Sequence, residues 1–179
     1  MPKYAAFLRA INLGGHTVKM DLLRRLFEEM GFANVATFIA SGNVIFEAAS
    51  NDSGELERKI DESLHARLGY RTAPFVRTMA ELAEIAHYEP FKESGLAASA
   101  STLYIAFLAY PPGEQALSKL MALGSDVNQF QTRGREVYWL CRTRFSDSGI
   151  SGAQIERALG MPSTIRNAST VKKIAEKYA

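Results

Sequence analysis

The sequence predicts an α+β protein made of two consecutive βαββαβ units followed by a C-terminal helix. Strand-like and helix-like patterns occur in the order strand, helix, strand, strand, helix, strand over residues 1–78, and again over residues 102–179. In each half the second and third strands flank a short turn sequence, Ser41-Gly42-Asn43 or Arg133-Gly134-Arg135. This order is that of the ferredoxin-like plait. We therefore expect two tandem plaits, joined by a helix and a loop over residues 79–101.

Each element of the first half has its own signal. The expected strands, all runs of strand-forming residues, are Tyr4–Leu8, Val35–Ile39, Val44–Glu47 and Pro74–Arg77. Proline is tolerated only at the start of a strand or on a sheet edge, so the last strand begins at Pro74. The first helix is expected to end before Gly31, and the second to run from the capping residue Asp52 to Gly69.

The linking segment and the second half show comparable signals. Thr78 and Glu81 form a capping-box pattern before a short helix, and residues 95–101 are interpreted as a loop poor in large side chains. The expected strands are Leu103–Leu108, Val127–Thr132, Glu136–Arg142 and Ser163–Arg166. The expected helices are Glu114–Leu123, Ser151–Leu159 and a terminal helix with Val171, Ile174, Ala175 and Tyr178 on its apolar face. The repetition is one of pattern, without a residue-by-residue match.

The composition is that of an ordinary globular chain. Of the 179 residues, 47% are hydrophobic and 22% are charged, which excludes a disordered or fibrous protein. The formal net charge of +2 is too small to indicate nucleic-acid binding by itself. Cys141 is the single cysteine, so it cannot form an intramolecular disulfide, and its apolar surroundings predict a buried thiol.

The chain carries the marks of a cytoplasmic protein. Arg9 interrupts the first apolar run, so we expect no signal peptide. No apolar segment approaches the roughly 20 residues that a membrane span needs, and we expect no membrane partner. Together with the single cysteine, these features favour a reduced, cytoplasmic setting.

The first candidate site is at the end of the first strand. Arg9 and Asn12 follow an apolar run and precede a double glycine. In a plait the first and third strands are antiparallel neighbours, so the end of one lies beside the start of the other. Arginine offers a planar fork and glycine-rich backbone offers N–H groups, which together suit a phosphate or carboxylate. The candidate ligand-binding residues are Arg9, Asn12, Gly14, Gly15, Ser41, Gly42 and Asn43.

Each of these residues also has a simpler interpretation. Gly42-Asn43 is a common turn pair, and the double glycine can serve only to turn the chain toward the first helix. Arg9 can pair with Asp21 or Glu47, and His16 is interpreted as a loop residue rather than a catalytic one. The combination still favours a site, because independent turns would not have to meet.

A second candidate site lies near the C-terminus. Asn167 or Ser169 is expected to cap the last helix, whose unpaired N–H groups attract anions, and Arg166 stands just before that helix. The alternative is a capped helix with one solvated arginine. The candidate residues of this second set are Thr164, Arg166 and Asn167.

No motif in the sequence specifies a reaction. It has no Gly-rich phosphate loop ending in Lys-Ser or Lys-Thr, no dinucleotide fingerprint after a strand and no Gly-x-Ser-x-Gly elbow. The three histidines lack metal-ligand spacing, and His65 and His87 are expected on the surface. We therefore predict no metal site and assign neither a cofactor nor a catalytic residue.

Four segments resemble a known family. The motifs of the bacterial family catalogued as domain of unknown function 1697 (DUF1697) are similar to Phe7–Gly15, Met20–Phe32, Ser41–Phe46 and Thr164–Lys173. The resemblance spans nearly the whole chain and implies a pair of plait-like domains, with no established activity, cofactor or substrate. Because both Arg-Asn sites fall within these motifs, the resemblance favours a ligand common to both.

Two residues depart from the pattern of that family. Ala10 stands where the family usually has glycine, and Ala168 stands where a tryptophan often follows the Arg-Asn pair. Ala10 adds only a methyl group, so we expect the same backbone path. Ala168 removes a large ring, and with it a stacking or packing role at this position.

The leading hypothesis is a protein that binds an anionic small ligand, a phosphorylated or carboxylate-bearing molecule. One alternative is binding of single-stranded nucleic acid through an open sheet face that carries Tyr104, Tyr138 or Trp139. Because the net charge is small, we favour burial of these rings. A further alternative is a non-catalytic scaffold or oligomerisation protein in which the arginines make structural pairs. The sequence indicates no particular oligomeric state.

Overall fold

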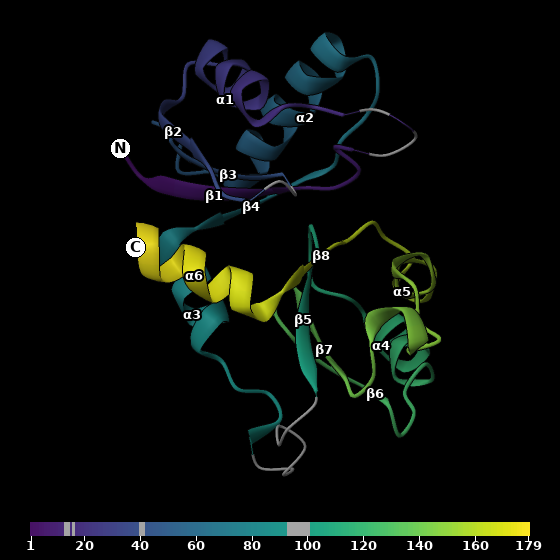
Figure 1. Cartoon of the computed structure of the whole chain (residues 1–179). Helices are drawn as coiled ribbons and strands as arrows, with labels where there is room; N and C mark the ends of the chain where they lie inside the picture. The colour runs from purple at the N-terminus through teal and green to yellow at the C-terminus, as the bar shows by residue number, and fades with distance from the viewer. Residues whose placement is uncertain (13–14, 16, 40–41, 93–100) are drawn as a thin grey trace. The chain divides into compact units, whose positions relative to one another are not determined.

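The computed structural model shows a mixed α+β protein with two four-stranded antiparallel sheets (Figure 1). The structure describes residues 1–12, 15, 17–39, 42–92 and 101–179. Gly14, His16, Ser41 and most of the predicted loop at 95–101 lie outside the described residues. The chain divides into two compact units, residues 1–83 with 174–179, and residues 84–173.

The described elements follow the order that the sequence predicts. The strands are β1 (Lys3–Leu8), β2 (Ala33–Thr37), β3 (Asn43–Glu47), β4 (Pro74–Thr78), β5 (Thr102–Phe107), β6 (Asn128–Arg133), β7 (Glu136–Cys141) and β8 (Thr164–Asn167). The helices are α1 (Met20–Glu29), α2 (Ser53–Leu68), α3 (Met79–His87), α4 (Glu114–Met121), α5 (Gly152–Leu159) and α6 (Ala168–Tyr178), with a short 3₁₀ helix over Phe145–Asp147. None of the described helices has both the length and the apolar character that crossing a bilayer requires.

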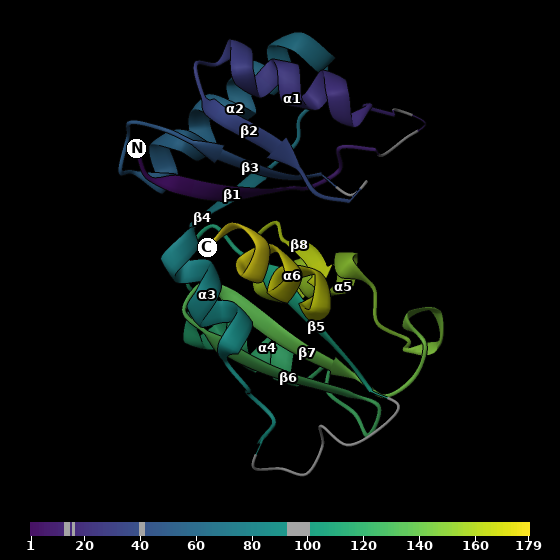
Figure 2. The ribbon, with the colours of Figure 1, turned by 60° about the vertical axis from the view of Figure 1, so that its left-hand side comes forward.

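The first sheet has the strand order β2-β3-β1-β4, so its first and third strands are antiparallel neighbours, as predicted. Phe7 of the central strand β1 pairs with Asn43 on one side and with Phe75 on the other. Pro74 is the first residue of the edge strand β4, where its missing N–H costs little. Helices α1 and α2 cover one face of this sheet (Figures 1 and 2), and their apolar sides pack against Tyr4 and Leu8.

The second sheet repeats this arrangement with the order β6-β7-β5-β8. Its core lies between one face of the sheet and helices α4 and α5, which supply Leu120 and Ile155. These side chains pack with Phe130 and Trp139 of the sheet. Cys141, at the end of β7, is fully buried in this core, as predicted.

A buried asparagine ties the second core to its loops. Asn128 donates its side-chain Nδ2 to the carbonyl of Ser148 at 2.7 Å, and its Oδ1 accepts the indole N–H of Trp139 at 2.9 Å. Ser148 and Trp139 are buried, and the polar groups of Asn128 therefore bond to protein atoms in place of water. Asn128 was not singled out from the sequence, because the pattern of a strand says nothing of a partner 20 residues away.

The two central strands match residue by residue, which the sequence analysis missed. Tyr4-Ala5-Ala6-Phe7-Leu8 and Tyr104-Ile105-Ala106-Phe107-Leu108 share four of five residues. They also share their register: Tyr4 pairs with Thr78 at the end of β4, and Tyr104 pairs with Asn167 at the end of β8. Each half is therefore built on the same Tyr-x-Ala-Phe-Leu strand, which is consistent with an internal duplication.

The helix ends lie where local signals place them. Asp52 accepts hydrogen bonds from the backbone N–H groups of Gly54 and Glu55, and Gly69 ends α2 in the left-handed conformation. Thr78 and Glu81 bond reciprocally as a capping box at the start of α3.

Strand β2 differs from the prediction. It ends at Thr37, two residues earlier than expected. Ile39 has a φ of +61°, so the extended backbone of β2 does not continue to this residue.

Candidate functional site

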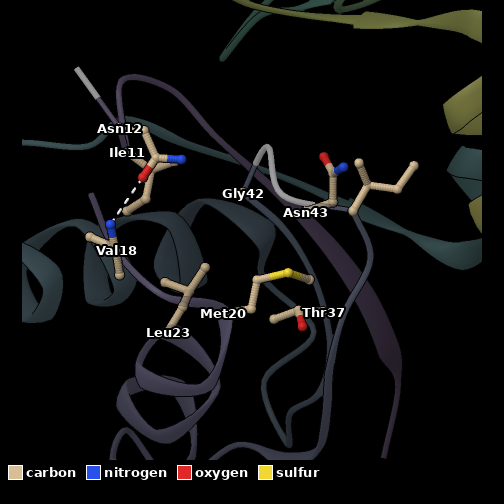
Figure 3. A pocket seen from close by; sticks show the side chains of 9 residues that line it. Ile11, Asn12, Val18, Met20, Leu23, Thr37, Gly42 and Asn43 are labelled. Carbon is tan, nitrogen blue, oxygen red and sulfur yellow. Dashed lines mark hydrogen bonds between the residues drawn. The ribbon is translucent and has the colours of Figure 1, made fainter. Parts of the chain in front are cut away.

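The end of β1 and the start of β3 meet, as the sequence predicts. The backbone N–H of Leu8 donates to the carbonyl of Gly42 at 2.9 Å. A Cβ atom built at Gly42 would lie 3.0 Å from Cγ2 of Ile11. Figure 3 shows the residues that line the hollow at this sheet end, with Gly42 facing Ile11 and Asn12. The segments that carry the first candidate set are therefore adjacent within the first unit.

Arg9 connects the end of β1 with the segment before β4, the strand on its other side. Its backbone N–H donates to the carbonyl of Ala73 at 3.0 Å, directly before β4, and its side chain is half-buried. The hydroxyl of Tyr70 donates to the carbonyl of Ile11 at 2.7 Å, and burial raises the pKa of this hydroxyl above its ordinary value. These bonds hold the chain that leaves β1 against the segment that enters β4.

The two candidate asparagines organise loops. The Oδ1 atom of Asn12 accepts the backbone N–H of Val18 at 3.0 Å, which closes the loop between β1 and α1 (Figure 3). Asn43 is fully buried, and its Nδ2 donates to the carbonyl of Phe38 at 3.0 Å. Asn12 Oδ1 and Asn43 Nδ2 thus stabilise the loops at this end of the sheet, and these two atoms already have hydrogen-bond partners.

The hollow between these walls is small. It is lined by Ile11, Asn12, Thr37, Gly42 and Asn43 among others, and its volume is about 10 Å³ (Figure 3). That volume is close to the space that one water molecule occupies. A phosphate or carboxylate group would therefore not fit inside the hollow.

Left-handed backbone gathers around the same sheet end. Ala10 has a φ of +60° and Ile39 a φ of +61°, and neither is a glycine. Gly15 and Gly42 have φ values of +81° and +77°, which glycine adopts without strain. A β-branched residue such as Ile39 rarely adopts this conformation, and such strain clusters at functional sites.

Ala10 is strained where the resembling family usually has glycine. The conformation at Ala10 is one that costs an L-residue about 1–2 kcal/mol relative to ordinary backbone. Ala10→Gly should relieve this strain, and the extra freedom of glycine in the unfolded chain offsets part of the gain. We expect the free energy of unfolding to rise by about 0.5–1 kcal/mol in urea titrations.

The control for this prediction is the same chemical change in a helix. Ala66 is exposed in α2, where glycine costs about 1 kcal/mol relative to alanine. Ala66→Gly should therefore lower stability while Ala10→Gly raises it. If both variants are destabilised to the same extent, the strain at Ala10 is not relieved by glycine.

The second candidate set is built into the edge strand β8. Arg166 is 8% exposed, and its Nη1 donates to Oγ1 of Thr164 at 2.7 Å and to the carbonyl of Ile165 at 3.0 Å. Burial lowers the pKa of the Arg166 guanidinium to about 10. The expectation of a solvated arginine is therefore wrong, because the sheet holds this side chain away from water.

Asn167 caps the last helix, α6. The sequence predicted either Asn167 or Ser169 for this role. Its Oδ1 accepts the backbone N–H of Ser169 at 2.9 Å and the hydroxyl of Ser169 at 2.8 Å. Thr164, Arg166 and Asn167 thus lie in one strand that leads directly into α6.

A second buried arginine occupies the equivalent place in the first unit. Arg77 is fully buried in β4, and its Nη1 donates to the carbonyl of the preceding residue, Val76, at 2.9 Å. Arg166 makes the same bond to the preceding Ile165. Both arginines stand in the last strand of a sheet, one residue before the cap of a helix. This repeated strand–arginine–cap order is the sequence signal by which Arg77 could have been found.

The comparisons with known proteins agree with this architecture. A family model described as "Protein of unknown function (DUF1697)" matches residues 1–138. The chain belongs to this family. A solved structure, of the conserved bacterial protein SP0830 from Streptococcus pneumoniae, is similar to this DUF1697 protein with a TM-score of 0.75 and 22% sequence identity, covering 98% of this chain and 97% of that chain. The comparison with curated proteins gave no match.

The structure places the remaining candidate residues of this DUF1697 protein as follows. Tyr138 and Trp139 are each 1% exposed, which confirms that these rings are buried, and Tyr104 packs against Trp139. His65 and His87 are on the surface, as predicted. Within the part of the chain that the structure describes, no three His, Cys, Asp or Glu side chains gather closely enough to hold a metal ion.

Proposed function

We propose that this protein binds a small anionic molecule at the end of its first sheet. The observation that carries the proposal is the pair of strained, non-glycine residues, Ala10 and Ile39, on segments that meet where Arg9 leaves β1. Strain of this kind persists where the surrounding structure demands it, as it does at binding and catalytic sites. Arg9 supplies the cation for a phosphate or carboxylate group.

The small volume of the hollow defines how such a ligand would bind. One oxyanion group contacts Arg9 and the glycine-containing loop from outside, and the rest of the molecule stays in solvent. The candidate contacts in this proposal are Arg9, Gly14, Gly15, Ser41 and Gly42, whereas Asn12 and Asn43 hold the loops around them. A second contact of the same chemistry is proposed at Thr164, Arg166 and Asn167, where the guanidinium of Arg166 supplies the cation.

The proposal includes the finer architecture. The strand orders and the βαββαβ sequence of both halves support ferredoxin-like plaits over residues 1–78 and 102–179, with residues 79–101 as the link. The single, buried cysteine supports a reduced, cytoplasmic setting.

Isothermal titration calorimetry with pyrophosphate and with citrate tests the proposed function. We expect saturable binding of at least one of these anions by the wild-type protein. Arg9→Gln should weaken it by about 10-fold, because a charge-assisted bond is lost. Arg25→Gln, an exposed arginine of α1, is the matched control and should bind as the wild type does. Equal affinities of the two variants, or no binding by the wild type, would overturn the proposal.

A further inference from the structure

A larger pocket lies in the second unit, beside the start of α6. Its volume is about 420 Å³, and the described residues that line it all belong to the second unit. Pockets that hold small molecules have volumes of about 300–1,000 Å³ and mostly apolar walls. This pocket is therefore of ligand size, unlike the hollow at the end of β1.

The walls of the pocket are largely apolar. Leu103 of β5 and Leu140 of β7 lie side by side in the sheet and form one wall. Tyr88 and Phe91, from the segment after α3, supply aromatic rings to the lining. Ala168, the first residue of α6, also lines the pocket, and its methyl group occupies little of the space. Flat apolar groups suit such a lining.

The charges of the lining are positive on balance. Lys92 and Lys172 both line the pocket, and Glu89 pairs with Lys92 at 3.4 Å. Lys172, one turn into α6, has no ion pair among the described residues. The start of α6 adds a partial positive charge beside it. One anionic group of a ligand near Lys172 would therefore compensate the positive charge that this lysine adds to the lining.

We propose that this pocket binds a small molecule with a flat apolar body and one anionic group. The body lies against Leu103, Leu140 and the aromatic rings, and the anionic group lies near Lys172. The site is separate from the sheet end of the first unit and does not depend on the function proposed there. The small side chain of Ala168 keeps the pocket open, so a large ring at this position would close it.

Calorimetry with 2-naphthoate tests this proposal, since the compound combines a flat apolar body with one carboxylate. We expect 1:1 binding with a dissociation constant of roughly 1 mM or below. Lys172→Gln should weaken the binding by about 10-fold, because the group that pairs with the carboxylate is lost. Lys173→Gln, at the adjacent exposed lysine that does not line the pocket, is the control and should have no effect.

Two further comparisons separate charge from shape. The neutral analogue 2-naphthalenemethanol should bind wild type and Lys172→Gln equally, because it lacks the carboxylate. Ala168→Trp should abolish binding of both compounds, whereas Ala66→Trp, on the exposed side of α2, should not. If circular dichroism shows that Ala168→Trp does not fold, Ala168→Leu takes its place and should reduce binding.

The outcomes are decisive in both directions. Loss of 2-naphthoate binding in the Ala168 variant, with a selective effect at Lys172, supports the proposal. Absence of binding by the wild type, equal effects at Lys172 and Lys173, or unchanged binding in a folded Ala168 variant overturns it. Arg9→Gln should leave 2-naphthoate binding unchanged, so a failure at this pocket is distinguishable from a failure of the proposed function.

Discussion

Replacing Arg77 by alanine is expected to lower the free energy of unfolding by about 3–5 kcal/mol. Arg77 is the second largest fully buried side chain after Trp139. Its Nη1 donates to the carbonyl of Val76, and the same atom lies 3.9 Å from Oε1 of Glu57. Alanine would leave a cavity the length of an arginine side chain, and the mostly buried carboxylate of Glu57 would lose its cation.

Urea unfolding followed by circular dichroism measures this loss, and Arg71→Ala is its control. Arg71 pairs with Asp61 at only 2.7 Å, a shorter distance than that from Arg77 to Glu57, but its side chain is 64% exposed. Solvent-exposed pairs contribute about 0–1 kcal/mol, so Arg71→Ala should change stability little. Equal losses in the two variants would show that burial is not what makes Arg77 important.

Arg77→Met separates packing from charge in the same experiment. Methionine fills much of the space of the arginine stem and brings no charge. If the cavity dominates, this variant should recover most of the stability that alanine loses. If the loss of the cation beside Glu57 dominates, Arg77→Met should remain almost as unstable as Arg77→Ala.

The secondary structure could be predicted from the sequence because its signals are local. Periodicity and caps such as Asp52, Gly69 and the Thr78–Glu81 pair act within one or two helical turns, and the structure forms those contacts. The strand order followed from the order of elements. The error at β2 arose because a run of apolar residues gives no warning that Ile39 has a positive φ.

Long-range roles of polar side chains could not be predicted in the same way. Asn128 was read as an ordinary strand residue, although it accepts a bond from Trp139 and donates to Ser148 across the core. Arg77 was likewise unremarked within its strand. Burial decides both roles, and burial depends on what the rest of the fold brings near. The Tyr-x-Ala-Phe-Leu repeat was visible in the sequence and would have aligned the two halves.

The meeting of the end of β1 with the start of β3 was predicted, and the roles of the side chains there were not. Antiparallel pairing of β1 with β3 brought Gly42 beside Leu8, as the topology requires. The use of Asn12 and Asn43 to close loops was not foreseen, because an amide side chain bonds a loop backbone as readily as a ligand. Ala168 lines the pocket beside α6, whereas the sequence analysis had taken this residue only as the loss of a ring.

Gly42→Ala is expected to lower the free energy of unfolding by about 2–5 kcal/mol. The φ of +77° at Gly42 costs an L-residue about 1–2 kcal/mol. The added Cβ would also lie 3.0 Å from Cγ2 of Ile11 and 3.1 Å from Cβ of Leu8, and such overpacking costs about 1–3 kcal/mol. Both neighbours are buried at the end of β1, so neither can move away freely.

Gly69→Ala isolates the conformational part of this loss. Gly69 has a similar φ of +82°, but no atom lies within 4 Å of the Cβ that alanine would add there. Its replacement should therefore cost only about 1–2 kcal/mol in the same urea titration. The difference between the two variants measures how tightly the end of β1 is held against the start of β3. If Gly42→Ala costs no more than Gly69→Ala, the two segments give way easily, and the sheet end is too loose to position Arg9 for an anion.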